Sequence, residues 1–430
     1  MKKPGRSGWF VVRAREPLVA VLIALGCGSG AASDGDASAR DTAQADAPEV
    51  QLLPTTPVSP CQWRGQQDTW IAEQGMTWMR YSCREACAGA WTTCAAPVSA
   101  RDQHAQEPKL ELPFVSDDMA GRLRLSDRSG PTITIHSGGP GTYYLAEGSV
   151  LTVPSGALIS ALESHAPQFF RVIEVKWEGG LFGQGVNTPK SEQPLDTRAS
   201  VGRSASLIRW IKANLAGGEG LATVGCSGGS VQSLGATLWY EGVDQDLAYQ
   251  LVSSGPPASW DVNTWCGGTP VTEGVCENDP TTSCTANAAC GDAKNRCAFE
   301  VASDSNIAHT LRLLVDLQHG TPNTCVGKQY STLFQADSFA FTPSRFRVGH
   351  RVDMVVAEGC NLAEGCNPAQ HSIDDTQEGI TGQMGRLFRA MTAAGADVVW
   401  TDLHNYGHCD AVLQPELVPD TVAKVAAGMR

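Results

Sequence analysis

Residues 221–240, LATVGCSGGSVQSLGATLWY, place a short apolar run, a glycine-rich turn and a helix-forming segment in direct succession. The run LATV has the length and the branched side chains of a buried strand, and a helix is predicted from Val231 to Gly242. Glycines in the turn let neighbouring backbone approach closely. This stretch constrains the fold strongly, because it requires a strand that turns sharply into a helix.

Strand and helix patterns alternate along most of the chain. Strands are predicted at 132–136, 171–177, 221–224, 247–254, 352–357 and 396–403, and helices at 154–167, 204–218, 231–242, 380–391 and 419–428. Such alternation is typical of a mostly parallel sheet with helices on both faces. The sequence therefore predicts an α/β fold, in which ligands bind at the carboxyl ends of the strands.

The N-terminus has the form of a targeting segment. A basic stretch precedes an apolar run of nine residues from Pro17 to Leu25, which is too short to span a bilayer and fits a secretory signal. Ala24-Leu25-Gly26-Cys27 resembles a bacterial lipoprotein cleavage site with Cys27 lipidated, and an ordinary signal peptide is the alternative. We expect residues 1–27 to be a signal and residues 28–58, which are small, polar and acidic, to be a disordered tether.

These features predict an exported protein. It would be an outer-membrane or cell-surface lipoprotein, attached to the membrane only through the lipid on Cys27, or a periplasmic or secreted protein. The net charge of −13 and the absence of a basic stripe exclude a nucleic-acid or phosphate-binding surface.

The cysteine content agrees with export. The chain has 15 Cys, and setting Cys27 aside leaves 14, an even number that indicates disulfides. We expect a small Cys-rich subdomain at 59–105 and an α/β domain at 106–430, interrupted by a disulfide-rich lid at about 260–350. Cys83 and Cys87 are spaced like zinc ligands, but no Cys/His quartet completes the pattern, so neither a metal nor a cofactor is predicted.

Gly225-Cys226-Ser227-Gly228-Gly229 matches the pattern Gly-x-Ser-x-Gly. A serine between a strand and a helix in this pattern sits on a very sharp turn, and the helix N-terminus favours a developing negative charge. A plain turn is the alternative. The flanking elements favour Ser227 as a nucleophile.

A nucleophilic serine needs a histidine as general base, and the expected place is after the last strand. His404 ends the strand pattern, whereas His408 follows Gly407 in a loop that can reach back over the sheet edge. We therefore assign the general base to His408, and a packed or surface role to His404.

The segment HSGGPG, residues 136–141, follows an early strand and can turn backbone N–H groups toward a substrate carbonyl. Gly138 and Gly139, together with the N–H of Gly228, are predicted to form an oxyanion hole. A Gly/Pro turn without such a role is the alternative.

The nucleophile turn, the oxyanion loop and the late histidine together resemble the α/β-hydrolase superfamily, over about residues 110–430 apart from the insertion. The loop resembles the HGGPG motif of prolyl aminopeptidase-like members, with Ser137 as an extra residue after His136. The resemblance implies an α/β-hydrolase fold and hydrolysis by an activated serine.

Two cysteines adjoin the predicted catalytic residues. Cys226-Ser227 and His408-Cys409 resemble the Cys-Ser … His-Cys pattern of the tannase and feruloyl esterase family, in which a disulfide joins the residues that flank nucleophile and histidine. The resemblance implies a Cys226–Cys409 disulfide. Such a bond holds Cα atoms within roughly 4.4–6.8 Å and would keep Ser227 within reach of His408.

The acid of the triad is the least defined member. In the superfamily an Asp usually follows the strand predicted at 352–357, but none occupies that position here. Glu364, in a loop that Cys360 and Cys366 can staple, is the favoured acid. The alternatives are Asn361, Asp261, and Asp374 and Asp375, which stand where a helix N-cap is expected.

Three functions follow from these residues. The first is an exported serine hydrolase that cleaves carboxylic esters, small or polymer-linked, through an acyl-enzyme on Ser227, with the cysteine pattern favouring aromatic or phenolic esters. The second is a prolyl or tripeptidyl aminopeptidase-like serine peptidase, suggested by GGPG. The third is a non-catalytic surface binding protein on a hydrolase scaffold, suggested by the irregular acid.

Overall fold

A computed structural model describes the chain from Val50 onward with gaps. The described residues are 50–55, 57–60, 63–73, 76–85, 97–102, 108–115, 120–126, 128–139, 141–147, 156–177, 197–256, 258–291, 295–319, 321, 323–357, 359 and 374–430. For the strands between residues 59 and 120 only the backbone is described. The predicted signal with Cys27, and all but the last part of the predicted tether, lie outside these residues.

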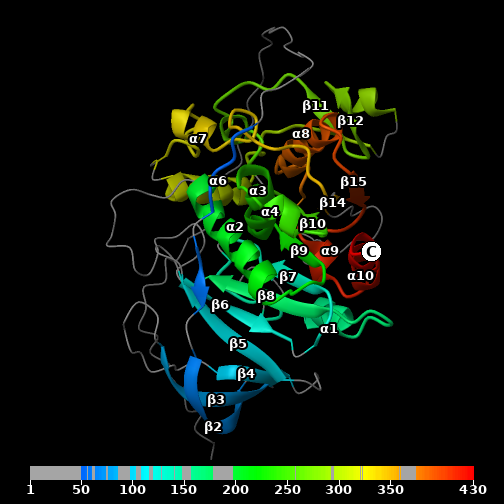
Figure 1. The fold of residues 1–430 in the computed structure, drawn as a ribbon. Coiled ribbons are helices and arrows are strands. Elements are labelled where there is room, and N and C mark those ends of the chain that lie inside the picture. Colours follow the sequence, from blue (N-terminus) through cyan, green and yellow to red (C-terminus); the bar gives the residue numbers. More distant parts are fainter. Residues whose placement is uncertain are drawn as a thin grey trace, which may run out of the picture. The chain divides into compact units, whose positions relative to one another are not determined.

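The centre of the fold is a mostly parallel sheet (Figure 1). Its parallel strands, in spatial order, are β15 (Val398–Leu403), β14 (Arg351–Ala357), β10 (Tyr249–Ser253), β9 (Leu221–Cys226), β7 (Thr132–His136) and β8 (Arg171–Trp177). All six strands predicted from apolar runs are present, and the predicted α/β fold class is confirmed.

Further strands extend this sheet beyond β8. They are β6 (Ala120–Leu125), β5 (Pro108–Val115), β4 (Pro97–Asp102), β3 (Met76–Glu85) and β2 (Trp63–Glu73), each antiparallel to its neighbour, with β1 (Ser59–Pro60) paired to β5. The segment 59–105, predicted to be a small Cys-rich subdomain, contributes strands that continue the main sheet. The side chains of its four cysteines are not described, so their pairing stays a prediction.

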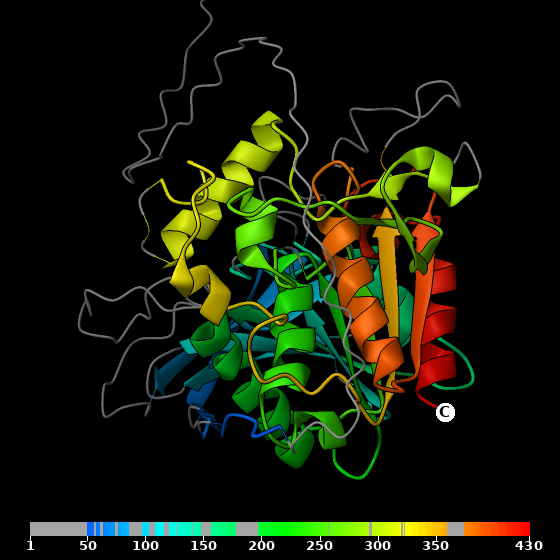
Figure 2. The ribbon, with the colours of Figure 1, turned by 90° about the horizontal axis from the view of Figure 1, so that it is seen from above.

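Helices cover both faces of the sheet and bury two separate apolar cores. On one face lie α2 (Thr197–Asn214), α3 (Gly228–Trp239) and α8 (Ile380–Ala393), and on the other α1 (Gly156–Glu163) and α10 (Val418–Gly428). Because successive strand residues point to opposite faces, Val172 joins one core and Ile173 the other. Figure 2 shows α8 and α10 on opposite sides of β14 and β15.

Short elements complete the C-terminal part of the domain. These are α4 (Val243–Asp246), before β10, and α9 (Asp410–Leu413), between β15 and α10. None of the helices described reaches both the length and the hydrophobicity that a membrane crossing requires.

The segment between β10 and β14 is built from small elements. They are α5 (Val262–Cys266), β11 (Gly274–Cys276), β12 (Asp279–Cys284), η1 (Asn287–Cys290), β13 (Cys297–Ala298), α6 (Asn306–His319) and α7 (Thr332–Ala336). Strands β11, β12 and β13 form a small antiparallel sheet, which we call the cysteine hairpin. It packs on α8, where Gly385 leaves room for the side chain of Val275.

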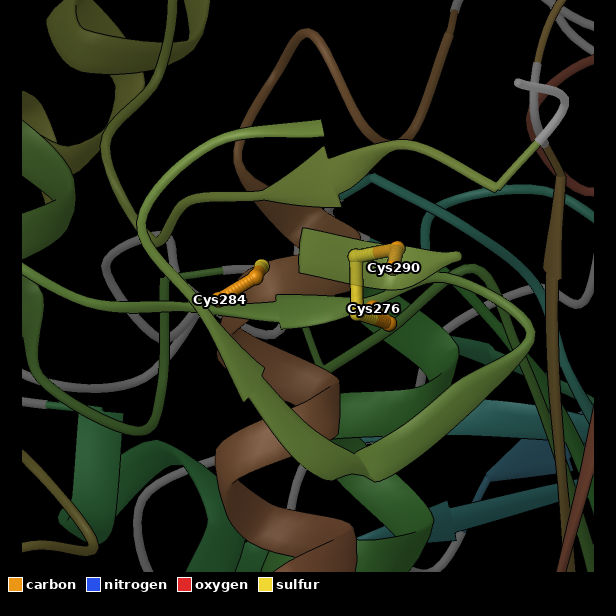
Figure 3. Close-up of side chains that lie close together, drawn as sticks. All are labelled: Cys276, Cys284 and Cys290. Atoms are coloured by element: carbon orange, nitrogen blue, oxygen red, sulfur yellow. A yellow bond between two sulfur atoms is a disulfide. The ribbon is translucent and has the colours of Figure 1, made fainter. Parts of the chain in front are cut away.

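The six cysteines of this insertion form three disulfides, Cys266–Cys325, Cys276–Cys290 and Cys284–Cys297. The last two cross-link the cysteine hairpin. Figure 3 shows Cys276, Cys284 and Cys290, whose sulfur atoms lie within 4.8 Å of one another. Each of these sulfurs is bonded to another sulfur, and a metal ligand would have to be a free thiolate. The cluster therefore consists of structural disulfides. They stabilise a segment whose apolar core is small.

Candidate active site

Ser227 occupies the turn between β9 and α3 in a strained conformation. Its φ of 52° and ψ of −117° are unusual for a residue with a side chain. Its backbone N–H donates to the carbonyl of Ser253 at 2.9 Å, which fixes the turn to the end of β10. A Cβ on Gly225 would lie 2.5 Å from the carbonyl oxygen of Gly229, so this sharp turn requires glycine there. The local sequence thus builds the sharp strand-to-helix turn that a nucleophile elbow requires.

His408 lies in the loop between β15 and α9. Its Nδ1 is 2.6 Å from Oδ1 of Asp375, and its side chain is 15% exposed, whereas that of Asp375 is fully buried. The loop is held on both sides of the histidine: the N–H of Gly407 donates to Asp410 at 2.6 Å, and the N–H of Cys409 donates to Ser254 at 2.8 Å. An imidazole fixed at Nδ1 by a carboxylate has Nε2 available to accept a proton.

A disulfide joins Cys226 to Cys409, with 5.5 Å between their Cα atoms. The two residues are 183 positions apart in sequence, and both side chains are buried. This is the pairing that the Cys-Ser … His-Cys resemblance implied. It ties the residue before Ser227 to the residue after His408, and so couples the nucleophile elbow to the histidine loop.

Asp375 is the carboxylate that contacts His408. Its second oxygen, Oδ2, accepts a hydrogen bond from the N–H of Ala357 at 3.0 Å, and its own N–H donates to the carbonyl of Ala357 at 3.0 Å. The carboxylate is therefore anchored at the end of β14, where a parallel α/β sheet places its functional residues. This geometry makes Asp375 the candidate for the acid that orients His408.

The other acids considered from sequence are placed differently. Glu364, the favoured one, and Asn361 lie outside the described residues. Asp261 caps α5 by accepting from the N–H of Thr264, and Asp374 pairs with Arg296. The interpretation of Asp374 and Asp375 as helix N-caps was wrong, because the N-cap of α8 is Gly379.

The predicted oxyanion residues gather beside Ser227. A Cβ on Gly138 would lie 3.3 Å from the Cβ of Ser227, and one on Gly228 would lie 2.2 Å from the carbonyl oxygen of Gly139. The loop after β7 therefore packs directly on the start of α3. This contact brings the backbone of two segments close to Ser227, which an oxyanion hole also requires.

The base of this loop rests on a buried polar network that sequence reasoning did not find. His136 is 3.3 Å through Nδ1 from the side-chain oxygen of Gln232, and Trp177 donates to the same oxygen at 2.9 Å. Burial lowers the pKa of His136 from 6.5 to about 4, although the hydrogen bond to Gln232 opposes the shift. His136 is therefore neutral in the folded protein at neutral pH and serves to anchor the loop.

His404 has the surface position that the sequence allowed, and two tryptophans at the start of the insertion, Trp260 and Trp265, contact other residues. His404 is exposed on the surface. Trp265 is 1% exposed and donates to the carbonyl of Glu378, and Trp260 packs against Phe346. Both tryptophans thus serve packing.

The buried His136 makes stability depend on acidity. The unfolded chain binds a proton near pH 6.5 and the folded protein only near pH 4, so the free energy of unfolding should fall as pH drops through this range. This group accounts for a loss of up to about 3 kcal/mol at the acid end. We expect His136→Asn to flatten the decline of urea-unfolding free energy between pH 7 and 4.5. His404→Gln is the surface control, and equal slopes for His136→Asn and wild type would contradict the assignment.

Removing the Cys226–Cys409 bond should destabilise the protein strongly. For a separation of 183 residues, the loss of loop-closure constraint is about 5 kcal/mol in the chain-entropy model. We expect the double variant Cys226→Ala, Cys409→Ala to show this drop in denaturant unfolding. The double variant Cys276→Ala, Cys290→Ala, which opens a separation of 14 residues, should lose about 3 kcal/mol. A non-reducing digest that pairs Cys226 with a different cysteine would end this interpretation.

Comparison with known proteins finds distant structural likenesses only. No family model matches the chain, and no curated protein matches it. Among solved structures, it is similar to brefeldin A esterase, described as a bacterial homologue of human hormone sensitive lipase, with a TM-score of 0.39, 14% identity and 72% of each chain covered. An esterase from the archaeon Pyrobaculum calidifontis gives a TM-score of 0.38 at 13% identity, covering 72% of this chain and 80% of that one.

The structure of esterase Est22 is similar at a comparable level. Its TM-score is 0.41 at 13% identity, and the match covers 76% of this chain and 81% of that one. Likenesses at this level assign neither a substrate nor a residue role to this chain. Its chemistry has to be argued from its own site.

Proposed function

We propose that this protein is a serine hydrolase that cleaves carboxylic esters through an acyl-enzyme on Ser227. The observation that carries the proposal is the Nδ1–Oδ1 contact of 2.6 Å between His408 and Asp375, in a loop joined by disulfide to the nucleophile elbow. A strained serine, a histidine and a buried carboxylate in this linkage form the arrangement that acyl transfer uses.

The reaction follows from these roles. The Ser227 oxygen attacks the ester carbonyl while His408 takes the serine proton, and the tetrahedral oxyanion accepts hydrogen bonds from backbone N–H groups at Gly138, Gly139 and Gly228. The C–O bond then breaks, and His408 returns the proton to the leaving alcohol. Water, deprotonated by His408, attacks the acyl-enzyme, and the acid leaves as serine regains its proton.

The finer points of the proposal rest on sequence. The cysteines flanking Ser227 and His408 support an ester with an aromatic or phenolic part, and the N-terminal segment supports export with a lipid on Cys27. The sequence GGPG supports an aminopeptidase-like alternative, and that alternative acts through the same serine.

A substrate panel separates these functions. We expect p-nitrophenyl acetate, butyrate and benzoate to be hydrolysed with higher kcat/KM than prolyl and other aminoacyl p-nitroanilides. A fluorophosphonate probe should label one site per chain. Faster anilide cleavage would favour the peptidase. Folded protein that neither labels nor turns over any ester would favour the binding protein on a hydrolase scaffold.

A further inference from the structure

The cysteine hairpin contacts the segment that carries Asp375, which we call the acid segment, residues 374–378. We propose that Arg296 of the hairpin is a positioning residue that holds Asp375 in register with His408, an inference that rests on the proposed hydrolase function. The insertion would then be part of the catalytic apparatus, by supporting the acid from outside the sheet.

Arg296 forms a salt bridge with Asp374, the residue that precedes the proposed acid. Its Nη1 donates to Oδ2 of Asp374 at 2.7 Å, and its Nη2 donates to Oδ1 at 3.2 Å. A two-pronged arginine–carboxylate pair fixes direction as well as distance. Asp374 in turn accepts from the N–H groups of Thr376 and Gln377 at 2.9 and 3.1 Å. The backbone on both sides of Asp375 is therefore organised around one carboxylate that Arg296 holds.

Glu277 contacts both Arg296 and the acid segment. We call Arg296, Asp374 and Glu277 the clamp. The side chain of Glu277 is fully buried and pairs with Arg296 at 2.7 Å, and it also accepts a hydrogen bond from the hydroxyl of Thr376. The N–H of Arg296 donates to the same carboxylate at 2.9 Å. A buried carboxylate without partners would be costly, so these bonds fix the guanidinium and the acid segment together.

The disulfides set the geometry of this pair. Glu277 follows Cys276 and Arg296 precedes Cys297, and these two cysteines lie opposite one another in β11 and β13. Cys276 is bonded to Cys290 (Figure 3), and Cys297 is bonded to Cys284. Glu277 and Arg296 therefore each adjoin a cross-linked cysteine. A hairpin with little apolar core is thereby made rigid enough to position another segment.

The cysteine hairpin also bonds to β15 and α8, the elements that adjoin the histidine loop and the acid segment in sequence. Trp400 of β15 donates to the carbonyl of Glu277 at 2.7 Å, close in sequence to the histidine loop. Arg389 of α8 donates to the carbonyl of Pro280. The clamp therefore spans from the strand before His408 to the segment of Asp375.

A displaced acid has a specific kinetic signature. A misplacement of about 1 Å can cost about 100-fold in rate. We expect Arg296→Gln to lower kcat on the best p-nitrophenyl ester by about 10- to 100-fold and to leave KM within about twofold. The acid limb of the kcat/KM profile should also move to lower pH, because a carboxylate farther from the imidazole stabilises its protonated form less. Arg296→Lys should restore part of kcat.

The test uses the full chain with Arg312→Gln as the matched control. Arg312 is a buried arginine of the same insertion that bonds to Asp304 and to the carbonyl of Ala302, and its charge acts to lower the pKa of Glu378 at the far end of the acid segment. Arg312→Gln should lower the free energy of unfolding without shifting the acid limb of the kcat/KM profile. Asp374→Asn serves as a second variant if Arg296→Gln does not fold, and it should reproduce the kinetic loss. The double variant Arg296→Gln, Asp374→Asn should have a kcat no lower than that of the less active single variant.

The failure of this inference differs from the failure of the proposed function. If Ser227→Ala is inactive while folded Arg296→Gln and Asp374→Asn both keep wild-type kcat and pH profile, the positioning role is overturned and the hydrolase function stands. A loss of kcat equal to that of Arg312→Gln, without a shift of the acid limb, also overturns it. If Ser227→Ala retains activity, the proposed function itself fails.

Discussion

Ser227→Ala is expected to lower kcat on the best ester substrate by about four to six orders of magnitude, without unfolding the protein. The substitution removes the only oxygen that can form the acyl-enzyme in the proposed mechanism. It leaves the oxyanion loop and the disulfide in place. The measurement is the initial rate of p-nitrophenolate release, with the melting temperature recorded in parallel.

Ser230 offers a matched control for this experiment. It lies three residues on, in the first turn of α3, is fully buried, and donates to the carbonyl of Ser253 at 3.0 Å. Ser230→Ala removes one buried hydrogen bond and should cost about 1 kcal/mol of stability while kcat stays within a few-fold of wild type. Ester turnover by Ser227→Ala at a rate close to wild type would refute the nucleophile assignment.

Asp375→Asn is expected to lower kcat by about three to four orders of magnitude. The buried carboxylate accepts from Nδ1 of His408 and from the N–H of Ala357. An amide in its place cannot stabilise the imidazolium that forms during attack, and it can hold the ring in the wrong tautomer. Steady-state kinetics across pH, with circular dichroism to check folding, measures the effect.

Glu364→Gln is the decisive companion variant, because Glu364 is the acid favoured by sequence alone. If Asp375 is the orienting acid, the kcat of Glu364→Gln should stay within a few-fold of the wild-type kcat. Asp261→Asn, which alters the cap of α5, should behave likewise. If Glu364→Gln loses activity and Asp375→Asn keeps it, Glu364 is the orienting acid and the role of Asp375 is refuted.

The sharp turn at Ser227 and the place of His408 after the last strand could be predicted because their signals are local. A strand, a Gly-x-Ser-x-Gly turn and a helix occupy consecutive residues, and the last strand is followed within a few residues by His408. The acid has no such signal. Asp375 is 18 residues from Ala357, yet it bonds to that residue at both its backbone and its side chain. A search directly after the strand does not single out a residue that stands 18 positions later in the sequence and yet bonds to the strand end.

The pair Asp374-Asp375 also carried a misleading local pattern. Two acids shortly before an amphipathic stripe are typical of a helix N-cap. In the structure, Gly379 caps α8, and the carboxylates of Asp374 and Asp375 instead bind Arg296 and His408 from distant segments. Contacts between side chains that are distant in sequence produce no periodic pattern from which they could be predicted. The strands of segment 59–105, predicted as a Cys-rich subdomain, pair with the main sheet through contacts that the sequence pattern did not indicate.

Trapping the acyl-enzyme tests the central claim most directly. The protein would be mixed with p-nitrophenyl benzoate, quenched in acid during the pre-steady-state burst, digested, and analysed by mass spectrometry. We predict one benzoyl group per chain, on the peptide that contains Ser227, and its absence from Ser227→Ala. Steady ester turnover with no covalent acyl group, or an acyl group on a different residue, would contradict the account.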